Sequence, residues 1–151
     1  MSDKMHISWN EYQNIIETLE ETLEVFKQEG IKFHFVSIYR GSLLMGQHLS
    51  NVMNSPLSIV KFQRLDGNDE EVEFIYNAGI SPREVIVILD DIYDTGKTLN
   101  KVKDYFITKY KKNITQAFTL TWNNNINEET PDWVTSDLKT NGKWVVFPWE
   151  K

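Results

Sequence analysis

The segment of this chain best suited to chemistry is a group of three carboxylates followed by small hydroxyl and glycine residues. Asp90 and Asp91 follow a strongly apolar run, and Asp94 precedes the residues Thr95-Gly96-Lys97-Thr98. Paired carboxylates accept hydrogen bonds from a vicinal diol and help to hold Mg²⁺, which prefers oxygen ligands. Hydroxyl side chains, a glycine and the N–H groups at a helix start suit a terminal phosphate. The segment therefore predicts a site for a phosphate and a diol on one ligand.

A second segment adds a positive charge and another glycine. The run Phe33 to Ile38 is aromatic and β-branched, which is typical of a buried strand, and Tyr39-Arg40-Gly41-Ser42 follows it. A guanidinium beside a glycine suits a second phosphate group, because the backbone can approach closely there. Two phosphate sites that flank a diol describe phosphoribosyl pyrophosphate (PRPP).

Hydrophobic periodicity predicts the elements that must position these residues. Ser8 and Glu11 have the spacing of a capping box, which predicts a helix that begins there and ends near Gly30. Further helices are expected over 43–53 and after Gly96. Strands are expected at 33–38, 57–62, 72–76, 85–89, 114–122 and 144–149.

The strand run Val85 to Leu89 is continuously apolar, which is typical of a parallel strand covered on both faces. Strands that alternate with helices predict an α/β fold with a doubly wound, mainly parallel sheet flanked by helices. Such sheets bind ligands beyond the carboxyl ends of their strands, where both polar segments are expected to lie. We expect a single domain over residues 1–151.

Composition narrows the classes of function. The 151 residues carry a formal charge of −6, which argues against a protein that neutralises nucleic-acid backbones. The chain has no cysteine, and its purest apolar run is too short to span a bilayer. We expect a cytoplasmic protein that acts on small molecules, without nucleic-acid or membrane partners.

The segment Val87 to Leu99 resembles the PRPP-binding signature of the type I phosphoribosyltransferases. The opening Ile7-Ser8-Trp9, the Arg40-Gly41 loop and the ending Trp144 to Trp149 are similar to the bacterial xanthine-guanine members of that family. The resemblance implies a purine phosphoribosyltransferase with PRPP and Mg²⁺, which transfers ribose 5-phosphate to guanine, xanthine or hypoxanthine. It also implies a homo-oligomer, either a dimer or a tetramer.

The resemblance assigns roles on the PRPP side. Asp90 and Asp91 would hold the ribose hydroxyls and the metal, and Asp94 would face the imidazole-ring nitrogen of the purine. The residues Thr95 to Thr98 would surround the 5-phosphate.

The resemblance also assigns roles around the leaving group and the base. Arg40 and Gly41 would meet the pyrophosphate, and Trp144 would stack on the purine. The carbonyl of Val145 would bind the edge of the base. Asn123 stands at or near the position where purine enzymes of the family have a lysine that contacts the six-position oxygen of the base. A flexible flap is expected over about residues 61–82, and a hood that binds the base over about 122–151.

Three departures from the family pattern keep other functions open. Ser42 occupies a position where the family usually has a second glycine, and the flap has Lys61-Phe62-Gln63-Arg64 where relatives have a Ser-Tyr pair. These two departures motivate a PRPP-sensing relative without catalysis. Asn123, at or near the position of the lysine, motivates a PRPP-dependent transferase with a different acceptor.

The residues around the motif argue against two unrelated classes of protein, the aspartic proteases and the P-loop nucleotide-binding proteins. The Asp-Thr-Gly of aspartic proteases needs a mostly β chain, whereas the segment after Gly96 has a helical pattern. A nucleotide-binding P-loop would need a glycine at the position of Asp91.

Overall fold

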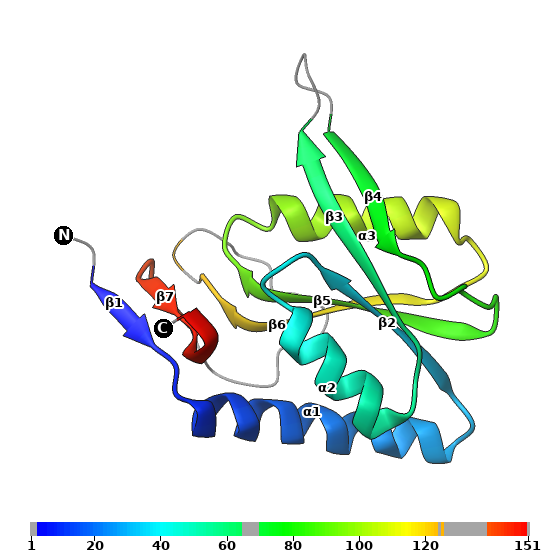
Figure 1. The fold of residues 1–151 in the computed structure, drawn as a ribbon, viewed down its shortest axis with the longest axis horizontal. Coiled ribbons are helices and arrows are strands. Elements are labelled where there is room, and N and C mark those ends of the chain that lie inside the picture. Colours follow the sequence, from blue (N-terminus) through cyan, green and yellow to red (C-terminus); the bar gives the residue numbers. More distant parts are fainter. Residues whose placement is uncertain (1–2, 65–69, 124, 126–138, 151) are drawn as a thin grey trace.

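A computed structural model describes residues 3–64, 70–123, 125 and 139–150 of the chain (Figure 1). Its larger sheet has the strand order β4-β3-β2-β5-β6, and a smaller sheet pairs β1 with β7. In chain order the elements are β1 (Lys4–His6), α1 (Trp9–Gln28), β2 (Lys32–Ile38), α2 (Leu43–Met53), β3 (Leu57–Arg64), β4 (Glu70–Tyr76), β5 (Glu84–Tyr93), α3 (Lys97–Lys109), β6 (Thr115–Trp122), β7 (Trp144–Val146) and a 3₁₀ turn at Pro148–Glu150.

The central sheet is parallel except at one edge. β2 lies between β3 and β5, β5 also pairs with β6, and all three pairings are parallel. β4 is antiparallel to β3, and together they form a hairpin that extends beyond the body of the sheet in Figure 1. The predicted α/β fold with a mainly parallel sheet flanked by helices is confirmed.

Helices cover both faces of this sheet, and each face has its own core (Figure 1). On one face α1 and α2 pack on alternate strand residues such as Phe35 and Leu89. On the other face Leu99, Val102 and Phe106 of α3 pack against residues such as Ile88. The apolar run in β5 is therefore continuous because both faces of the strand are buried.

Local sequence signals fix the ends of the helices. The Ser8 hydroxyl accepts a hydrogen bond from the Glu11 N–H at 3.1 Å, and the Glu11 carboxylate accepts one from the Ser8 N–H at 3.2 Å. This capping box satisfies two N–H groups that a helix start leaves unpaired. After α1 the chain turns at Gly30, whose φ of 92° is accessible to glycine at little cost.

Several predicted strand limits differ from the structure, and one strand was not predicted. β5 continues to Tyr93, four residues beyond the apolar run, because it still pairs with β6 there. The last strand ends at Val146 rather than at 149, since Pro148 begins a 3₁₀ turn and has no N–H to donate. β1 was not expected, because three residues are too few to show a periodic pattern.

The expected flap, about 61–82, includes the outer part of the β3–β4 hairpin. Its flexibility stays a prediction, and residues 65–69 lie outside the described part of the chain. Of the expected hood, about 122–151, residues 124, 126–138 and 151 also lie outside it. Within the described ranges, no helix is both long and apolar enough to cross a membrane.

His34 forms a buried polar link between three strands at the end of the sheet remote from the motif. Its Nε2 lies 2.7 Å from the Ser58 hydroxyl and its Nδ1 lies 3.2 Å from the Glu84 carboxylate. The side chain is fully buried, and this burial lowers the pKa of His34 although Glu84 opposes the shift. His34 is therefore a sheet residue whose two ring nitrogens both have partners.

This lowered pKa predicts how stability depends on pH. The folded protein binds the His34 proton less readily than the unfolded chain does, so its contribution is complete above about pH 6.5 and is lost as the pH falls below that value. The drop in unfolding free energy between pH 7.5 and pH 5.5, measured by urea titration, should be smaller in His34→Gln than in wild type. Equal drops in both proteins would contradict this role.

Candidate active site

The carboxylate pair lies within the sheet rather than in a loop. Asp90 and Asp91 belong to β5, and Asp90 is paired with Thr119 of β6. The Asp91 N–H donates to the Asp90 carboxylate at 2.9 Å. Both residues are partly buried at the carboxyl end of the strand. Because they belong to a paired strand, the sheet fixes their backbone in the absence of a ligand.

Burial and mutual repulsion make this pair costly to ionise. Burial raises the pKa of Asp90 well above its usual value, and the neighbouring charge of Asp91 adds to the effect. Burial also raises the pKa of Asp91, while its hydrogen bonds oppose that shift. A bound cation would relieve this repulsion, so the two side chains fit a divalent metal such as Mg²⁺.

The loop after β5 leads directly into the first turn of α3. Gly96 has a φ of 79°, and a Cβ there would collide with the ring of Tyr93. Both the backbone conformation and the lack of space for a side chain therefore require glycine at this position. The Lys97 N–H contacts the Thr95 hydroxyl at 3.3 Å. The helix dipole and the N–H groups of the first turn favour an anion in this loop.

The Arg40-Gly41 loop touches the carboxylate pair. A Cβ at Gly41 would collide with the carboxylate of Asp91, so the Asp91 side chain lies closer to the Gly41 backbone than any other residue type would permit. The Ser42 hydroxyl lies 2.8 Å from the Leu89 carbonyl, within β5, and 3.0 Å from the Ile38 carbonyl, at the end of β2. The peptide bond between Tyr39 and Arg40 is cis, and Arg40 is exposed at the surface of the loop.

Ser42 does not strain the loop. Its φ is −106°, which is ordinary for any side chain, so this position does not need the second glycine of the family pattern. Its buried hydroxyl instead ties the loop to the two central strands.

These segments line one cleft of about 390 Å³. The cleft contains the carboxylates, the glycine of each loop and the first turn of α3, which fits the predicted combination of diol and phosphate chemistry. The Arg40 side chain is not part of its wall. The lining residues are Ile38, Tyr39, Gly41, Asp90, Asp91, Ile92, Asp94, Thr95, Gly96, Lys97, Thr98 and Leu99.

A second cavity of about 370 Å³ lies between the carboxylates and the C-terminal segment. Trp144 is 67% exposed on its wall, so a flat ligand could reach its ring, whereas Val145 is buried. Asp91, Ile92 and Asp94 belong to both cavities, which are therefore neighbours. The other lining residues are Gly142, Lys143, Phe147 and Glu150.

Lys143 and Glu150 were missed by the sequence analysis. Both place charges on the wall of the second cavity, although neither belongs to the motifs that drew attention. Their positions beside Trp144 and Trp149, at the two ends of the aromatic segment, were the only signal in the sequence.

Asn123 has a different environment from the other residues expected around the base. It is 3% exposed, and its amide Nδ2 donates to the Asp94 carboxylate at 2.8 Å. It does not belong to the wall of the second cavity. The structure thus brings Asn123 to Asp94, while Trp144 and Val145 face the cavity.

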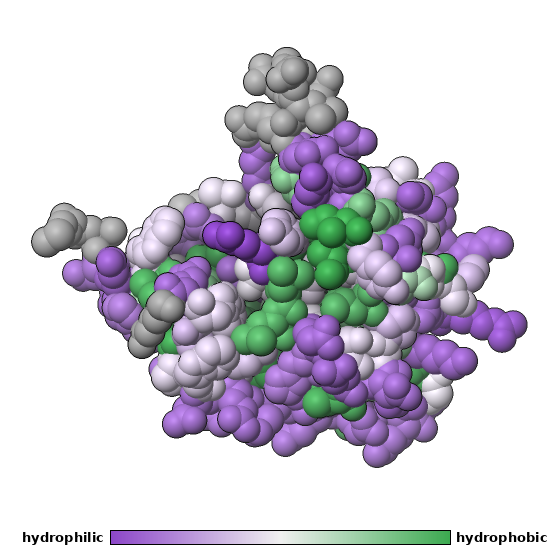
Figure 2. Space-filling model, viewed as in Figure 1, coloured by the Kyte–Doolittle hydropathy of each residue, from purple (hydrophilic) through white to green (hydrophobic). Residues whose placement is uncertain are grey.

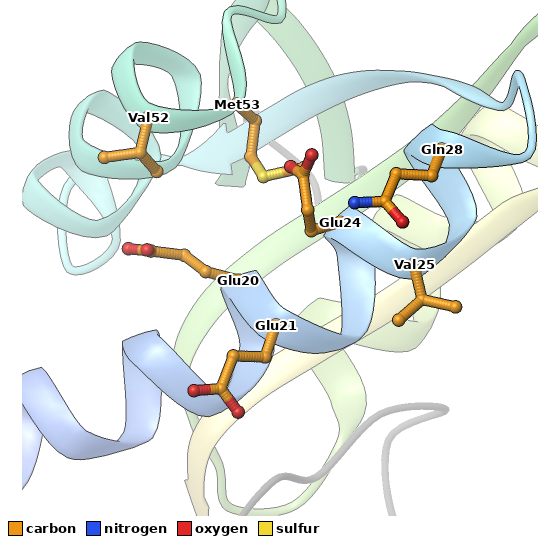
Figure 3. A pocket seen from close by; sticks show the side chains of 7 residues that line it. All are labelled: Glu20, Glu21, Glu24, Val25, Gln28, Val52 and Met53. Carbon is orange, nitrogen blue, oxygen red and sulfur yellow. The ribbon is translucent and has the colours of Figure 1, made fainter.

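A groove elsewhere on the molecule, between α1 and α2, lacks these features (Figure 3). Its volume is about 360 Å³, but its described wall presents three carboxylates and no cation, which disfavours a phosphate ligand. It is lined by Glu20, Glu21, Glu24, Val25, Gln28, Val52 and Met53.

Comparison with known proteins identifies the family. The family model named phosphoribosyl transferase domain matches residues 3–150. The chain belongs to the phosphoribosyltransferase family. This makes it an enzyme of the glycosyltransferase type. No curated protein sequence matches the chain.

Solved structures of phosphoribosyltransferases share the fold. A purine phosphoribosyltransferase from Pyrococcus horikoshii is 26% identical with a TM-score of 0.80, and the match covers 99% of this chain and 95% of that chain. A xanthine-guanine-hypoxanthine phosphoribosyltransferase from Helicobacter pylori is 18% identical with a TM-score of 0.76, and the match covers 97% and 93%. The chain therefore has the fold of purine phosphoribosyltransferases.

The raised pKa values predict that the carboxylate pair lowers stability at neutral pH. Because folding makes both groups harder to ionise, stability is lost as the pH rises through their folded pKa values. Asp90→Asn should therefore raise the unfolding free energy at pH 7.5 by roughly 1 kcal/mol, with a smaller gain near pH 4. Urea titrations at both pH values test this, and a variant less stable than wild type at pH 7.5 would contradict it.

The contact between Gly41 and Asp91 predicts a loss of function without loss of fold. In Gly41→Ala the new methyl group must displace the Asp91 carboxylate, and misplacing a reacting geometry by about 1 Å costs on the order of 100-fold in kcat/KM. Thermal unfolding should change little, because the displaced group is the end of a side chain. Gly30→Ala is the control for a change from glycine to alanine without a collision: it lies outside both cavities, and nothing lies within 4 Å of a Cβ there. Wild-type kcat/KM for PRPP in Gly41→Ala would contradict the contact.

Proposed function

We propose that this chain is a purine phosphoribosyltransferase that transfers ribose 5-phosphate from PRPP to an oxopurine and releases pyrophosphate. The observation that carries the proposal is the pair of adjoining cavities that share Asp91, Ile92 and Asp94. One cavity has the groups for a phosphorylated sugar, and the other has an exposed indole ring for a planar base. The anomeric carbon would lie where the two cavities meet.

The PRPP side follows from the first cavity. The residues from Thr95 to Thr98 would hold the 5-phosphate at the start of α3, and Asp90 and Asp91 would accept the ribose hydroxyls. The same two carboxylates would hold Mg²⁺, which supplies charge neutralisation for the pyrophosphate group. Gly41 offers its backbone to the pyrophosphate, and Arg40 adds a positive charge to that loop.

The base side follows from the second cavity. Trp144 would stack on the purine, an arrangement worth roughly 1–3 kcal/mol per base on nucleic-acid platforms. The Val145 carbonyl would accept from an N–H of the base edge. Lys143, also on this wall, carries an ammonium that suits the oxo groups of guanine, xanthine or hypoxanthine.

In the proposed reaction a purine nitrogen forms a bond to the anomeric carbon while the bond to pyrophosphate breaks. The positive charge that develops on the ribose resembles that of glycosyl transfer. Asp94 lies on the wall shared by the cavities, where its carboxylate would accept the proton from the imidazole-ring nitrogen. The flap would exclude water that could hydrolyse PRPP.

We also propose that the protein acts as a homo-oligomer in the cytoplasm. Apolar side chains gather on the face that carries α2 and β3 (Figure 2), and Leu44 and Val52 of α2 are 41% and 50% exposed. An exposed apolar face of this kind supports a protein–protein contact. A dimer or a tetramer would cover it.

The proposal predicts pyrophosphate release from PRPP and Mg²⁺ only when an acceptor base is present. Guanine, xanthine, hypoxanthine, adenine, orotate and uracil are offered separately, and turnover is expected with an oxopurine. Asp94→Asn should lower kcat by about 10²–10⁴-fold, because the amide cannot take the proton. Asp104→Asn, an acidic residue on α3 outside both cavities, is the matched control.

Other outcomes point to the remaining alternatives. Turnover with adenine, orotate or uracil alone would favour a different acceptor. Binding of PRPP without turnover of any base would favour a sensor without catalysis. Full activity in Asp94→Asn would refute the proposed proton transfer.

A further inference from the structure

Asn123 is joined to Asp94 through the main chain as well as the side chain. It directly follows β6, and its backbone N–H donates to the Tyr93 carbonyl at 2.8 Å. Tyr93 ends β5 and immediately precedes Asp94. The pairing of the two strands therefore delivers the Asn123 side chain to Asp94.

The orientation of the Asn123 amide is set by two hydrogen bonds. The Asn125 backbone N–H, which can only donate, lies 3.0 Å from one amide atom, so this atom must be the oxygen Oδ1. The nitrogen Nδ2 then faces the Asp94 oxygen at 2.8 Å. Turning the amide over would place a donor against a donor and an acceptor against a carboxylate, so both bonds would be lost. The amide thus has one orientation.

We propose that Asn123 is a positioning residue that holds the Asp94 carboxylate in place for the proton transfer, and not a ligand of the base. This inference rests on the proposed transferase function. Asn123 is buried, lies outside the wall of the second cavity and donates to Asp94, whereas Lys143 and Trp144 do line that wall.

A planar amide restrains Asp94 by a directional contact. The Asn123 amide donates to one carboxylate oxygen at 2.8 Å, and its own oxygen is held by the Asn125 N–H, so the group that restrains the carboxylate is itself fixed. A lysine ammonium has three rotatable donors and would impose no such orientation. The replacement of lysine therefore changes how Asp94 is held, and leaves the cavity wall to supply the contacts with the base.

The test separates positioning from base binding by steady-state kinetics. In Asn123→Ser and Asn123→Leu, kcat should fall by about 10–100-fold, the range for loss of a hydrogen bond to a charged group. KM for the base and for PRPP should stay within about threefold of wild type. Asn123→Leu keeps a side-chain volume similar to that of asparagine. Thermal unfolding shows which of the two variants is folded, and the kinetic constants are compared for that variant. Asn51→Ala, an exposed asparagine on α2, is the control and should leave both constants unchanged.

The opposite result would overturn the inference. A rise in KM for the base with an unchanged kcat would make Asn123 a base ligand. If the wild-type enzyme turned over none of the bases, the proposed function would fail, and crystal structures would decide the inference separately. A carboxylate of Asp94 that turns away from its wild-type orientation in Asn123→Ser would support positioning, and an unchanged orientation would refute it.

Discussion

The parallel pairing of β2 with β5 is the constraint on which the site depends. Because the two strands run in register from Lys32 with Glu84 to Ser37 with Leu89, both end at the same edge of the sheet. The loop that follows β2 carries the glycine next to Asp91, and the Ser42 hydroxyl binds the Leu89 carbonyl of β5. A shift of one residue would turn the strand side chains to the opposite face and separate the two loops.

The carboxyl end of β5 carries two carboxylates that lower the stability of the fold. Asp90 and Asp91 follow the apolar residues Val85 to Leu89 within one strand, and burial raises the pKa of each. The loop after β5 also needs a left-handed glycine against Tyr93. The groups at the edge of the sheet that would receive a phosphorylated sugar are thus destabilising. At the opposite end of the sheet, His34 is buried with its hydrogen bonds satisfied. The division is typical of an enzyme in which a rigid sheet supports a reactive edge.

Most of the fold could be predicted from the sequence because the two periodicities are strong. The helix over Leu43–Met53 has the predicted limits, and the central strands lie where their apolar runs indicate. Hydropathy could not predict that β5 continues through Asp90 to Tyr93, since that extension depends on hydrogen bonds to β6. β1 depends in the same way on a partner at the other end of the chain.

The candidate site was less predictable away from its contiguous motif. Residues 90–98 form one cleft with Gly41 because the sheet brings two loops together, as the topology indicated. The contact between Asn123 and Asp94, and the places of Lys143 and Glu150, depend on side chains that meet across elements distant in sequence. A linear pattern carries no signal for such contacts.

The binding of PRPP to the purified protein is the most direct test of the central claim, which is that the two loops form one site for a phosphorylated sugar. Calorimetric titration with and without Mg²⁺ should show one molecule bound per chain, with tighter binding when the ion is present. Ribose 5-phosphate, which lacks the pyrophosphate, should bind more weakly, because it cannot reach the loop at Gly41. A folded protein that binds neither compound, or binds both equally in the presence of Mg²⁺, would contradict the account.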